Sequence, residues 1–208
     1  MSTKKFKDFV LESEKEEYEF SELPKDIQEE ILDRYRYTNV ETDDWYEYII
    51  EEFEKEMEEA GLDDIECQFT GFHSQGDGAS FTGKVLDNLK FIRESLGVKI
   101  SGDAADNLYI TIHRTDTRHC HENTITGNVE VDGEEEIEVI ISADVFYTID
   151  VNKKAEELEP KVTDWARQKS KELYKKLYAC YEDLTSDSSV KSFLEGNNYM
   201  FDEYGKSI

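Results

Sequence analysis

Residues 69–83 read Phe-Thr-Gly-Phe-His-Ser-Gln-Gly-Asp-Gly-Ala-Ser-Phe-Thr-Gly and organise the centre of the chain. Strand-forming side chains such as Phe69 and Phe81 stand on either side of a polar turn that contains Gly76 and Gly78. Two strand-like runs around a glycine-containing turn predict a β-hairpin. We therefore expect two neighbouring antiparallel strands here, joined by a polar loop.

Two helical patterns precede this hairpin. Pro24 suits the first turn of a helix, and apolar side chains follow it at helical spacing through Tyr35. Thr42 is placed to cap a second helix, and Gly61 is typical of its end. The apolar stripe of this second helix recurs every four residues and is expected to face a sheet. It consists of Trp45, Ile49, Phe53 and Met57.

Short strands and helices alternate after the hairpin. A short helix is predicted over 86–96, and polar turns then separate three strand-like runs that predict an antiparallel meander. These runs lie at 108–114, 124–131 and 137–142. A long helix is predicted over 160–184, and Ser186 is placed to cap a last short helix. The stretch 143–158 has a mixed period and is not assigned.

These elements predict an α+β fold with an antiparallel sheet of about four to five strands, several helices packed against it and a long C-terminal helix. A chain of 208 residues with 38% hydrophobic and 12% aromatic content can bury a core without disulfides or metal. We expect a single domain over 18–208. Residues 1–17 are predicted to form a flexible acidic N-terminal segment.

Cysteine usage and hydropathy predict a protein of a reducing cytoplasm. The three cysteines, at positions 67, 120 and 180, show no paired spacing, and no apolar signal segment follows the basic residues near the N-terminus. No apolar run approaches the roughly 18 residues of a membrane span. Anionic lipid headgroups would also repel so acidic a chain, so we expect no membrane partner.

The formal net charge is −26, from 50 acidic and 24 basic side chains. Direct binding of nucleic acid depends on cations that displace the counterions of phosphates, and a surface of this sign opposes that effect. Nucleic acid is therefore not an expected partner. A basic protein is the favoured partner, because complementary potentials accelerate encounter and contribute to specificity.

The glycine-containing loop has two interpretations. Successive backbone N–H groups in a Gly-x-Gly turn can bind an anion, with hydroxyl and amide side chains as further donors. The candidate ligand-binding residues are His73, Ser74, Gln75, Gly76, Asp77, Gly78 and Ser80. However, no lysine follows as in a phosphate-binding loop, and Asp77 would oppose a phosphate. The alternative is a tight structural turn in which Asp77 caps its own loop.

Three histidines of odd parity, His113, His119 and His121, could meet on paired strands. Together with Cys120 or Glu122 they would match the ligand preferences of zinc. A hairpin tip would instead scatter these side chains over the surface, and we favour that alternative. No metal and no cofactor are therefore predicted. No catalytic residue is assigned either, because the chain has no recognised nucleophile–base motif.

The second predicted helix carries a row of carboxylates at positions i, i+4, i+7 and i+11, namely Glu47, Glu51, Glu54 and Glu58. Neighbours in this row lie about 4.5 to 6 Å apart along the helix axis. That spacing is similar to the spacing of charges along a nucleic-acid backbone. The alternative is an ordinary solvated helix face in an acidic protein.

Three blocks of the chain, taken in order, form a recognisable pattern. The most specific block is Phe69-Thr-Gly-Phe-His-Ser-Gln-Gly-Asp-Gly-Ala-Ser-Phe. The other two run from Tyr18-Glu-Phe-Ser-Glu-Leu-Pro to Asp44-Trp45 and from Leu173-Tyr174 to Asn198-Tyr199. Together they resemble a family of proteins encoded by bacteriophages and prophages, and the resemblance implies an accessory protein of phage origin.

Charge and resemblance together predict an acidic binding protein that inhibits a basic host protein, namely a nuclease or a nucleic-acid-binding defence complex. This is an inhibitor of the anti-CRISPR or anti-restriction type, acting by DNA mimicry through the carboxylate row. One alternative is a protein that binds a small ligand or nucleotide signal with the Gly-Asp-Gly loop. A second alternative is a metal-dependent hydrolase that uses the central histidines. The sequence favours a binding protein over an enzyme.

Overall fold

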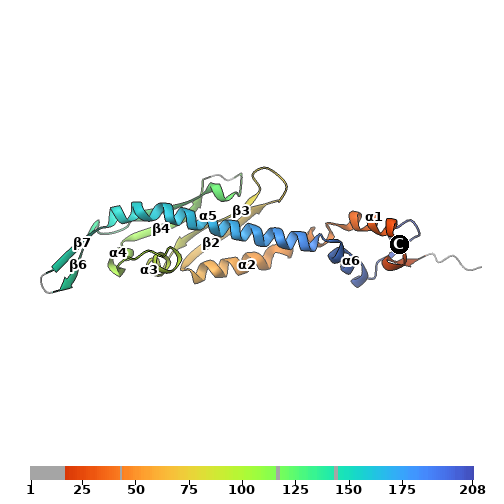
Figure 1. The fold of residues 1–208 in the computed structure, drawn as a ribbon, viewed down its shortest axis with the longest axis horizontal. Helices are drawn as coiled ribbons and strands as arrows, with labels where there is room; N and C mark the ends of the chain where they lie inside the picture. The colour runs from red at the N-terminus through yellow and green to blue at the C-terminus, as the bar shows by residue number, and fades with distance from the viewer. Residues whose placement is uncertain (1–16, 43, 116–117, 143–144) are drawn as a thin grey trace, which may run out of the picture. The chain divides into compact units, whose positions relative to one another are not determined.

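The computed structural model describes residues 17–42, 44–115, 118–142 and 145–208 (Figure 1). The chain divides into two compact units. Unit 1 combines Met1–Thr42 with Glu182–Ile208, and unit 2 is Asp43–Tyr181. The flexible segment predicted over 1–17 lies outside the described residues except for its last position.

Unit 2 is built on a four-stranded antiparallel sheet in the order β2-β3-β4-β5. Its strands are β2 (Leu62–Thr70), β3 (Gly78–Val85), β4 (Leu108–Arg114) and β5 (Ile125–Val131). Phe69 pairs with Ala79 and Thr70 with Gly78, which confirms the predicted hairpin. The register shifts between Asp63 and Glu66, near the start of the edge strand β2.

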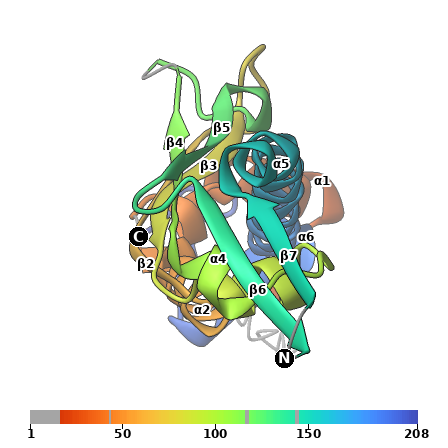
Figure 2. The ribbon, with the colours of Figure 1, turned by 90° about the vertical axis from the view of Figure 1, so that its left-hand side faces the viewer.

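Two helices cover one face of this sheet, α2 (Asp44–Glu59) and α5 (Val151–Leu184). Phe81 of β3 contacts both, because its ring centroid lies 5.2 Å from that of Phe53 on α2 and 6.3 Å from that of Trp165 on α5. Figure 2 shows α5 beside the sheet, seen nearly along its axis. The predicted apolar stripe of α2 faces this core: Ile49, Phe53 and Met57 are buried and Trp45 is half-buried.

The predicted helix over 86–96 is divided into α3 (Asn88–Lys90) and a π-helical turn, η3 (Phe91–Ser95). The wider turn closes with a hydrogen bond from the Leu96 N–H to the Phe91 carbonyl, 3.2 Å long. It buries Phe91 and Ile92 completely. Short helices α4 (Gly102–Asp106) and η4 (Glu122–Thr124) complete the connections of unit 2.

The strand expected at 137–142 does not extend the meander. It is β6 (Glu136–Ser142), which pairs with β7 (Val145–Asp150) in a separate two-stranded sheet. Asn107 explains the departure, because its backbone carbonyl accepts from Asp132 N–H at 2.8 Å and its side-chain oxygen from Glu134 N–H at 2.6 Å. These bonds turn the chain away after β5.

The long helix was predicted to start at Pro160, but α5 begins at Val151 and contains Pro160 in its interior. A proline inside a helix removes one hydrogen bond and is unfavourable by itself. Here the apolar stripe continues across it, with Val151, Ala155, Leu158 and Val162 buried. Packing of that stripe therefore outweighs the local preference. The predicted α+β class, with a four-stranded sheet and a long helix late in the chain, is confirmed.

Unit 1 combines segments from both ends of the described chain. From the first segment come β1 (Tyr18–Glu19), η1 (Phe20–Glu22), α1 (Lys25–Tyr35) and η2 (Thr38–Val40); from the second come α6 (Asp187–Gly196) and β8 (Met200–Phe201). β1 and β8 pair antiparallel, with Tyr18 opposite Phe201. The core of unit 1 is Phe20, Leu23, Ile31, Val190, Leu194 and Phe201.

Two helix boundaries predicted from the sequence are confirmed in unit 1. The helix predicted after Pro24 is α1, and Ser186 caps α6, because its hydroxyl accepts from the Ser189 N–H at 3.2 Å. Among the described helices, none combines the length and the apolar character that crossing a membrane requires.

Candidate functional site

The loop between β2 and β3 is closed by its own carboxylate. Oδ2 of Asp77 accepts hydrogen bonds from the backbone N–H groups of His73, at 2.9 Å, and Ser74, at 2.7 Å. Gly76 has φ +95°, a conformation that L side chains rarely adopt. This is the geometry of a turn capped by its own aspartate.

The same loop packs against residues 118–124. A Cβ added at Gly76 would lie 2.7 Å from Nδ1 of His119, and one at Gly78 would lie 2.8 Å from the carbonyl oxygen of Cys120. Only glycine fits such close approaches. The remaining candidate ligand residues differ in exposure: His73, Ser74 and Gln75 are exposed, whereas Ser80 is fully buried. The Ser80 hydroxyl has no hydrogen-bond partner within the described ranges.

The three histidines of the zinc hypothesis occupy different surroundings. His113 is exposed on β4 opposite Thr126, and His119 packs against Gly76. Nδ1 of His121 lies 3.2 Å from a carboxylate oxygen of Glu122. In the part of the chain that the structure describes, no group of three or more His, Cys, Asp or Glu side chains is arranged to hold a metal ion.

The carboxylate row predicted on the second helix lies on α2, and we call Glu47, Glu51, Glu54 and Glu58 the acidic row. Glu54 is half-buried and the other three are exposed. None of the four forms an ion pair with any residue in the described ranges. Burial, followed by the neighbouring charges of Glu58 and Glu51, raises the pKa of Glu54 above its ordinary value. The row therefore behaves as a set of mutually repelling charges.

Two other carboxylates of α2, Glu52 and Glu56, face α5 and are neutralised; we call them the paired carboxylates. Nζ of Lys169 lies 2.6 Å from Glu56, and Nζ of Lys176 lies 3.4 Å from Glu56 and 4.0 Å from Glu52. The hydrogen bond from Lys169 lowers the pKa of Glu56 below its ordinary value. Among the described residues, the carboxylates of α2 that are balanced by lysines are thus those on the side of α5.

The acidic row borders the edge strand β2. Cys67 on β2 is half-buried, and burial followed by the charge of Glu54 raises the pKa of its thiol to about 12. The charge of Glu54 on α2 therefore acts on a side chain of β2. Because alternate residues of a strand share one face, Phe69 lies next along the same side of β2. Its ring centroid is 4.8 Å from that of Tyr46 on α2.

A group of half-buried rings continues from this contact, and Phe72 stands at its centre. The Phe72 ring centroid lies 4.8 Å from that of Tyr181, 5.4 Å from Tyr178 and 5.8 Å from Phe69. We define the aromatic cluster as Trp45, Tyr46, Phe69, Phe72, Tyr174, Tyr178 and Tyr181. None of these seven side chains is fully buried. The cluster joins the start of α2, the hairpin loop and α5 within unit 2.

Residues 45–187 match the family model of a domain of unknown function (DUF8835), and this range is more than half of the chain. The chain belongs to the DUF8835 family. No curated protein and no solved structure matches it. The range that defines this DUF8835 member contains the acidic row, the hairpin loop and the aromatic cluster. Most of unit 1 lies outside that range.

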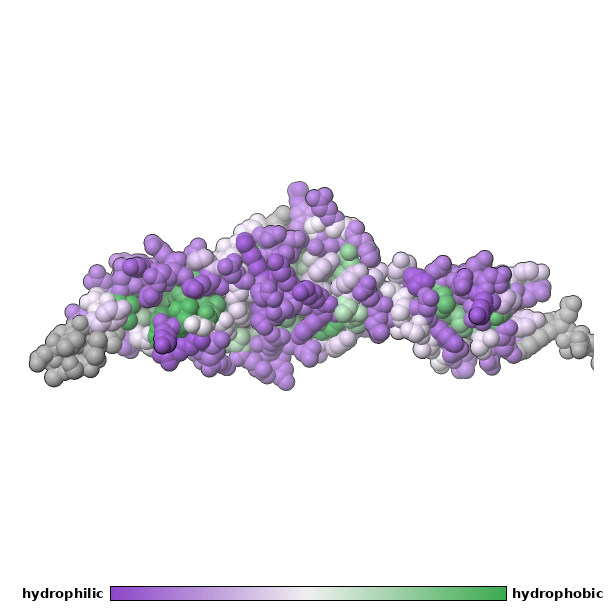
Figure 3. Space-filling view, viewed as in Figure 1, coloured by the Kyte–Doolittle hydropathy of each residue, from purple (hydrophilic) through white to green (hydrophobic). Residues whose placement is uncertain are grey.

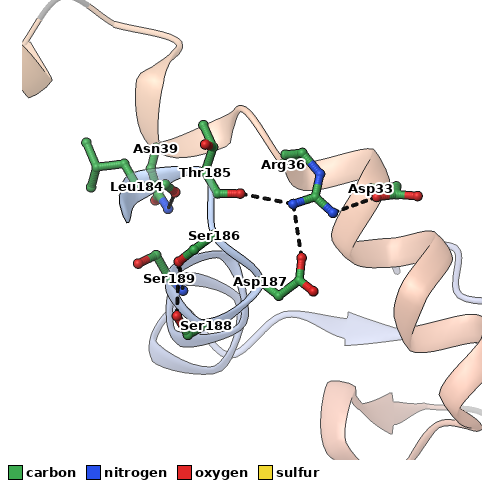
Figure 4. Close-up of polar contacts among 9 residues, drawn as sticks. All are labelled: Asp33, Arg36, Asn39, Leu184, Thr185, Ser186, Asp187, Ser188 and Ser189. Carbon is green, nitrogen blue, oxygen red and sulfur yellow. Dashed lines mark hydrogen bonds and ion pairs between the residues drawn. The ribbon is translucent and has the colours of Figure 1, made fainter. Parts of the chain in front are cut away.

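In unit 1 of this DUF8835 chain, one arginine joins the end of α1 to the start of α6 (Figure 4). The Arg36 guanidinium lies 2.6 Å from Asp33 and 3.0 Å from Asp187, and it donates to the Thr185 carbonyl at 3.0 Å. The Asn39 amide donates to the Leu184 carbonyl, also at 3.0 Å. These donors satisfy carbonyls at the end of α5 that have no partner within a helix. These contacts of Arg36 and Asn39 are therefore structural.

Two cavities in unit 2 of the DUF8835 chain are lined by residues outside the hairpin loop. One of about 320 Å³ is lined by Glu56, Met57, Ala60, Glu94, Ser95, Trp165 and Lys169. It contains the ion pair between Glu56 and Lys169 and adjoins the π-helical turn. A second, also about 320 Å³, is lined by Lys99, Ile100, Ser101, Tyr147, Ile149 and Lys154. Neither includes the loop residues that the sequence singled out.

Sequence reasoning missed the functional candidates on α5. Tyr174 and Tyr178 are four residues apart, so they share one helix face, and this spacing was the signal that could have joined them to Tyr181. Lys169 and Lys176 are seven residues apart and equally share a face. The charge pattern of α5 alone could not indicate that this face meets α2, because that contact depends on the tertiary fold.

Proposed function

We propose that this protein binds a basic partner protein through the acidic row of α2. The observation that carries the proposal is the contrast on one helix. The row keeps four carboxylates without an ion pair to a described residue, whereas the paired carboxylates are neutralised by Lys169 and Lys176. Like charges at these helical spacings cost about 0.2 to 0.5 kcal/mol per pair. A partner that brings cations to the row removes this repulsion.

The form of the surface supports a partner that handles nucleic acid. The row presents one charge about every 4.5 to 6 Å along a straight helix. A groove that binds phosphates carries cations at comparable intervals, so the two potentials are complementary. On the face drawn in Figure 3, hydrophilic side chains cover most of unit 2, with smaller apolar areas between them.

The biological setting rests on the resemblance to proteins of phages and prophages. In that setting the partner is a nuclease or a nucleic-acid-binding defence complex of the bacterial host, and the protein inhibits it as a DNA mimic of the anti-CRISPR or anti-restriction type. Binding then takes place in the host cytoplasm. The carboxylates of the acidic row then bind the partner's cations in place of the phosphates of the competing nucleic acid.

The loop geometry supports this function over a small-ligand site. Oδ2 of Asp77 is already occupied by two backbone N–H groups, and Gly76 and Gly78 are packed against residues 119–121. Backbone N–H groups of the loop are thus used to close the turn. An anion would have to displace the Asp77 carboxylate to reach the two N–H groups that it binds.

The test is affinity capture from nuclease-treated bacterial lysate with matched charge variants. The row variant replaces Glu47, Glu51, Glu54 and Glu58 with Gln. The control replaces four exposed acids elsewhere in unit 2, Asp106, Glu156, Glu159 and Asp164, with the corresponding amides. We expect one basic protein to be retained by the parent and the control at low salt, and lost with the row variant or at high salt. Equal retention by both variants would overturn the proposal.

A further inference from the structure

The aromatic cluster lies beside the acidic row within unit 2. Tyr46 and Glu47 are consecutive on α2, and Ile50 lies four residues from both Tyr46 and Glu54. Residues three and four apart on a helix are surface neighbours. Tyr46 contacts Phe69 on β2, and the charge of Glu54 acts on Cys67, two positions earlier on the same strand. The row and the cluster therefore form one continuous surface.

The second border of the cluster is also acidic. Oδ2 of Asp77 accepts a hydrogen bond from the backbone N–H of His73, the residue after Phe72, and the Phe72 ring centroid lies 5.6 Å from that of Tyr174. Burial, followed by the charges of Asp77 and Glu122, raises the pKa of Tyr174. Glu122 is partly balanced, because Nζ of Lys171 lies 3.6 Å from one of its carboxylate oxygens. The field at this border is therefore weaker than at the acidic row. Half-buried rings thus lie between two groups of carboxylates.

One exposed ring extends this surface beyond the cluster. Tyr48 is 58% exposed, and its hydroxyl lies 3.3 Å from Sγ of Cys180 on α5. The bond fixes the orientation of a ring that keeps most of its area in solvent. Tyr48 lies three residues before Glu51 of the row, so the two side chains are surface neighbours on α2. Aromatic side chains held rigidly and half-exposed are enriched at the centres of protein interfaces.

We propose that the basic partner presents arginine side chains to this surface, and that the aromatic cluster together with Tyr48 binds their guanidinium groups. The inference rests on the proposed function, because it assigns chemistry to the partner of the acidic row. A guanidinium is planar and weakly hydrated, so it stacks on a ring while it donates two hydrogen bonds to a carboxylate. A lysine ammonium is a compact, strongly hydrated charge and fits this combination less well. The surface therefore selects arginine over lysine.

The experiment compares two fluorescein-labelled peptides of equal length and charge, one with six arginines and one with six lysines spaced by Gly and Ser. Fluorescence anisotropy gives the dissociation constant of each with the full-length protein at low ionic strength. A cation over an exposed ring contributes about 0.5 to 1 kcal/mol, which corresponds to about a two- to fivefold difference in affinity. We expect the arginine peptide to bind more tightly by at least this factor.

Ring-removing variants locate the source of the preference. Tyr48→Leu and Trp45→Leu are expected to equalise the two peptides, whereas Trp45→Phe keeps a ring and preserves the preference. Tyr147→Leu is the matched control, because Tyr147 is 54% exposed on β7 of the same unit. Thermal melts check the fold of each variant, and Tyr48→Leu alone carries the test if Trp45→Leu does not fold.

Trp fluorescence gives a second measurement, since the chain has only two tryptophans. In a Trp165→Phe background, the emission of Trp45 is expected to change when the arginine peptide binds and not when the lysine peptide binds. An unchanged emission with both peptides bound would overturn the inference.

The outcomes separate this inference from the proposed function. Equal affinity for both peptides in the parent, with loss of both in the row variant, overturns the arginine inference and leaves the acidic row as the binding surface. An arginine preference that survives Tyr48→Leu also overturns the inference. Binding that is the same in the parent and the row variant overturns both proposals.

Discussion

Two sides of helix α2 carry the same residue type and differ in what surrounds them. On the side of α5, Glu56 accepts a 2.6 Å ion pair from Lys169 and has a lowered pKa. On the side of β2, Glu54 has no ion pair with a described residue and has a raised pKa. The net charge of −26 therefore affects the two sides of α2 differently. Carboxylates repel one another on the side of β2, where no lysine of the described residues forms an ion pair with them.

The difference also separates stability from function. A carboxylate neutralised inside the fold holds two elements together. A carboxylate left beside others of the same sign weakens its own helix and gains only when an external cation arrives. The paired carboxylates therefore belong to the fold of unit 2, and the acidic row is the surface that we propose for a partner.

The largest expected effect comes from Phe53→Ala. This variant removes the buried ring that packs α2 against the sheet and so holds both of its sides in place. Phe53 is 1% exposed and contacts Phe81. Deleting a buried phenylalanine ring costs about 3 to 5 kcal/mol of unfolding free energy. Urea denaturation measures the loss, with Tyr48→Ala on the exposed side of α2 as the control. A loss below about 1 kcal/mol would contradict the packing described for α2.

Lys169→Met tests the paired carboxylates. The variant keeps the apolar stem of the side chain and removes the ammonium group that pairs with Glu56. We expect the free energy of unfolding to fall by about 1 kcal/mol. The effect is moderate because the pair is partly exposed and Lys176 remains nearby. Lys175→Met is the control, since Lys175 is exposed and has no ion pair among the described residues. An equal loss of unfolding free energy in both variants would mean that the ion pair of Lys169 stabilises the fold no more than an exposed lysine does.

The pH dependence of two single variants should have opposite signs. The pKa of Glu56 is lowered by folding, so its stabilisation is present above the ordinary glutamate pKa of about 4.3 and is lost as pH falls through the folded value. The pKa of Glu54 is raised, so stability falls as pH rises from about 4.3 through the folded value. Near neutral pH, Glu56→Gln is therefore expected to destabilise and Glu54→Gln to stabilise.

Chemical denaturation at about pH 7 and about pH 3.5 checks these signs. At the lower pH, the free energy of unfolding of both variants should approach that of the parent, because the two carboxylates are then largely protonated in the unfolded chain. If both differences had the same sign near neutral pH, the two sides of α2 would be equivalent and the comparison would fail.

The smallest effect is expected from the exposed members of the acidic row. Replacing Glu47, Glu51 and Glu58 with Gln should raise unfolding free energy by about 0.2 to 0.5 kcal/mol for each like-charged pair removed. The gain should shrink at high salt, because exposed charges are screened. Thermal melts at two salt concentrations measure it. Destabilisation by the triple variant would mean that the row is already satisfied within the fold.

Local chemistry made much of the fold predictable. The Gly-Asp-Gly hairpin, the cap at Ser186 and the apolar stripe of α2 were all visible as short patterns. The start of α5 was not, because the local effect of Pro160 opposed a buried stripe that only the tertiary fold explains. β6 was assigned to the wrong sheet for a similar reason, since the Asn107 bonds that redirect the chain connect residues far apart in sequence.

The candidate site divides in the same way. The acidic row was predictable because helical spacing alone defines it. Its contrast with Glu52 and Glu56 was not, because the lysines that neutralise them come from α5, more than a hundred residues later. The aromatic cluster needed the same contact, since it joins the first turns of α2 to Tyr174, Tyr178 and Tyr181.

The composition of unit 1 has a consequence for synthesis on the ribosome. Arg36 and the Thr185 carbonyl that it binds are 149 residues apart, and β1 pairs only with β8. At about 5 to 20 residues per second, α1 emerges roughly 7 to 30 s before the segment that covers its apolar stripe. Unit 2 is synthesised during that interval, and its core includes Leu173 and Leu177 of α5, so that core is complete only shortly before Thr185 emerges. The first helix of the nascent chain is therefore without its covering segment throughout the synthesis of unit 2, and is accessible to chaperones and proteases during that time.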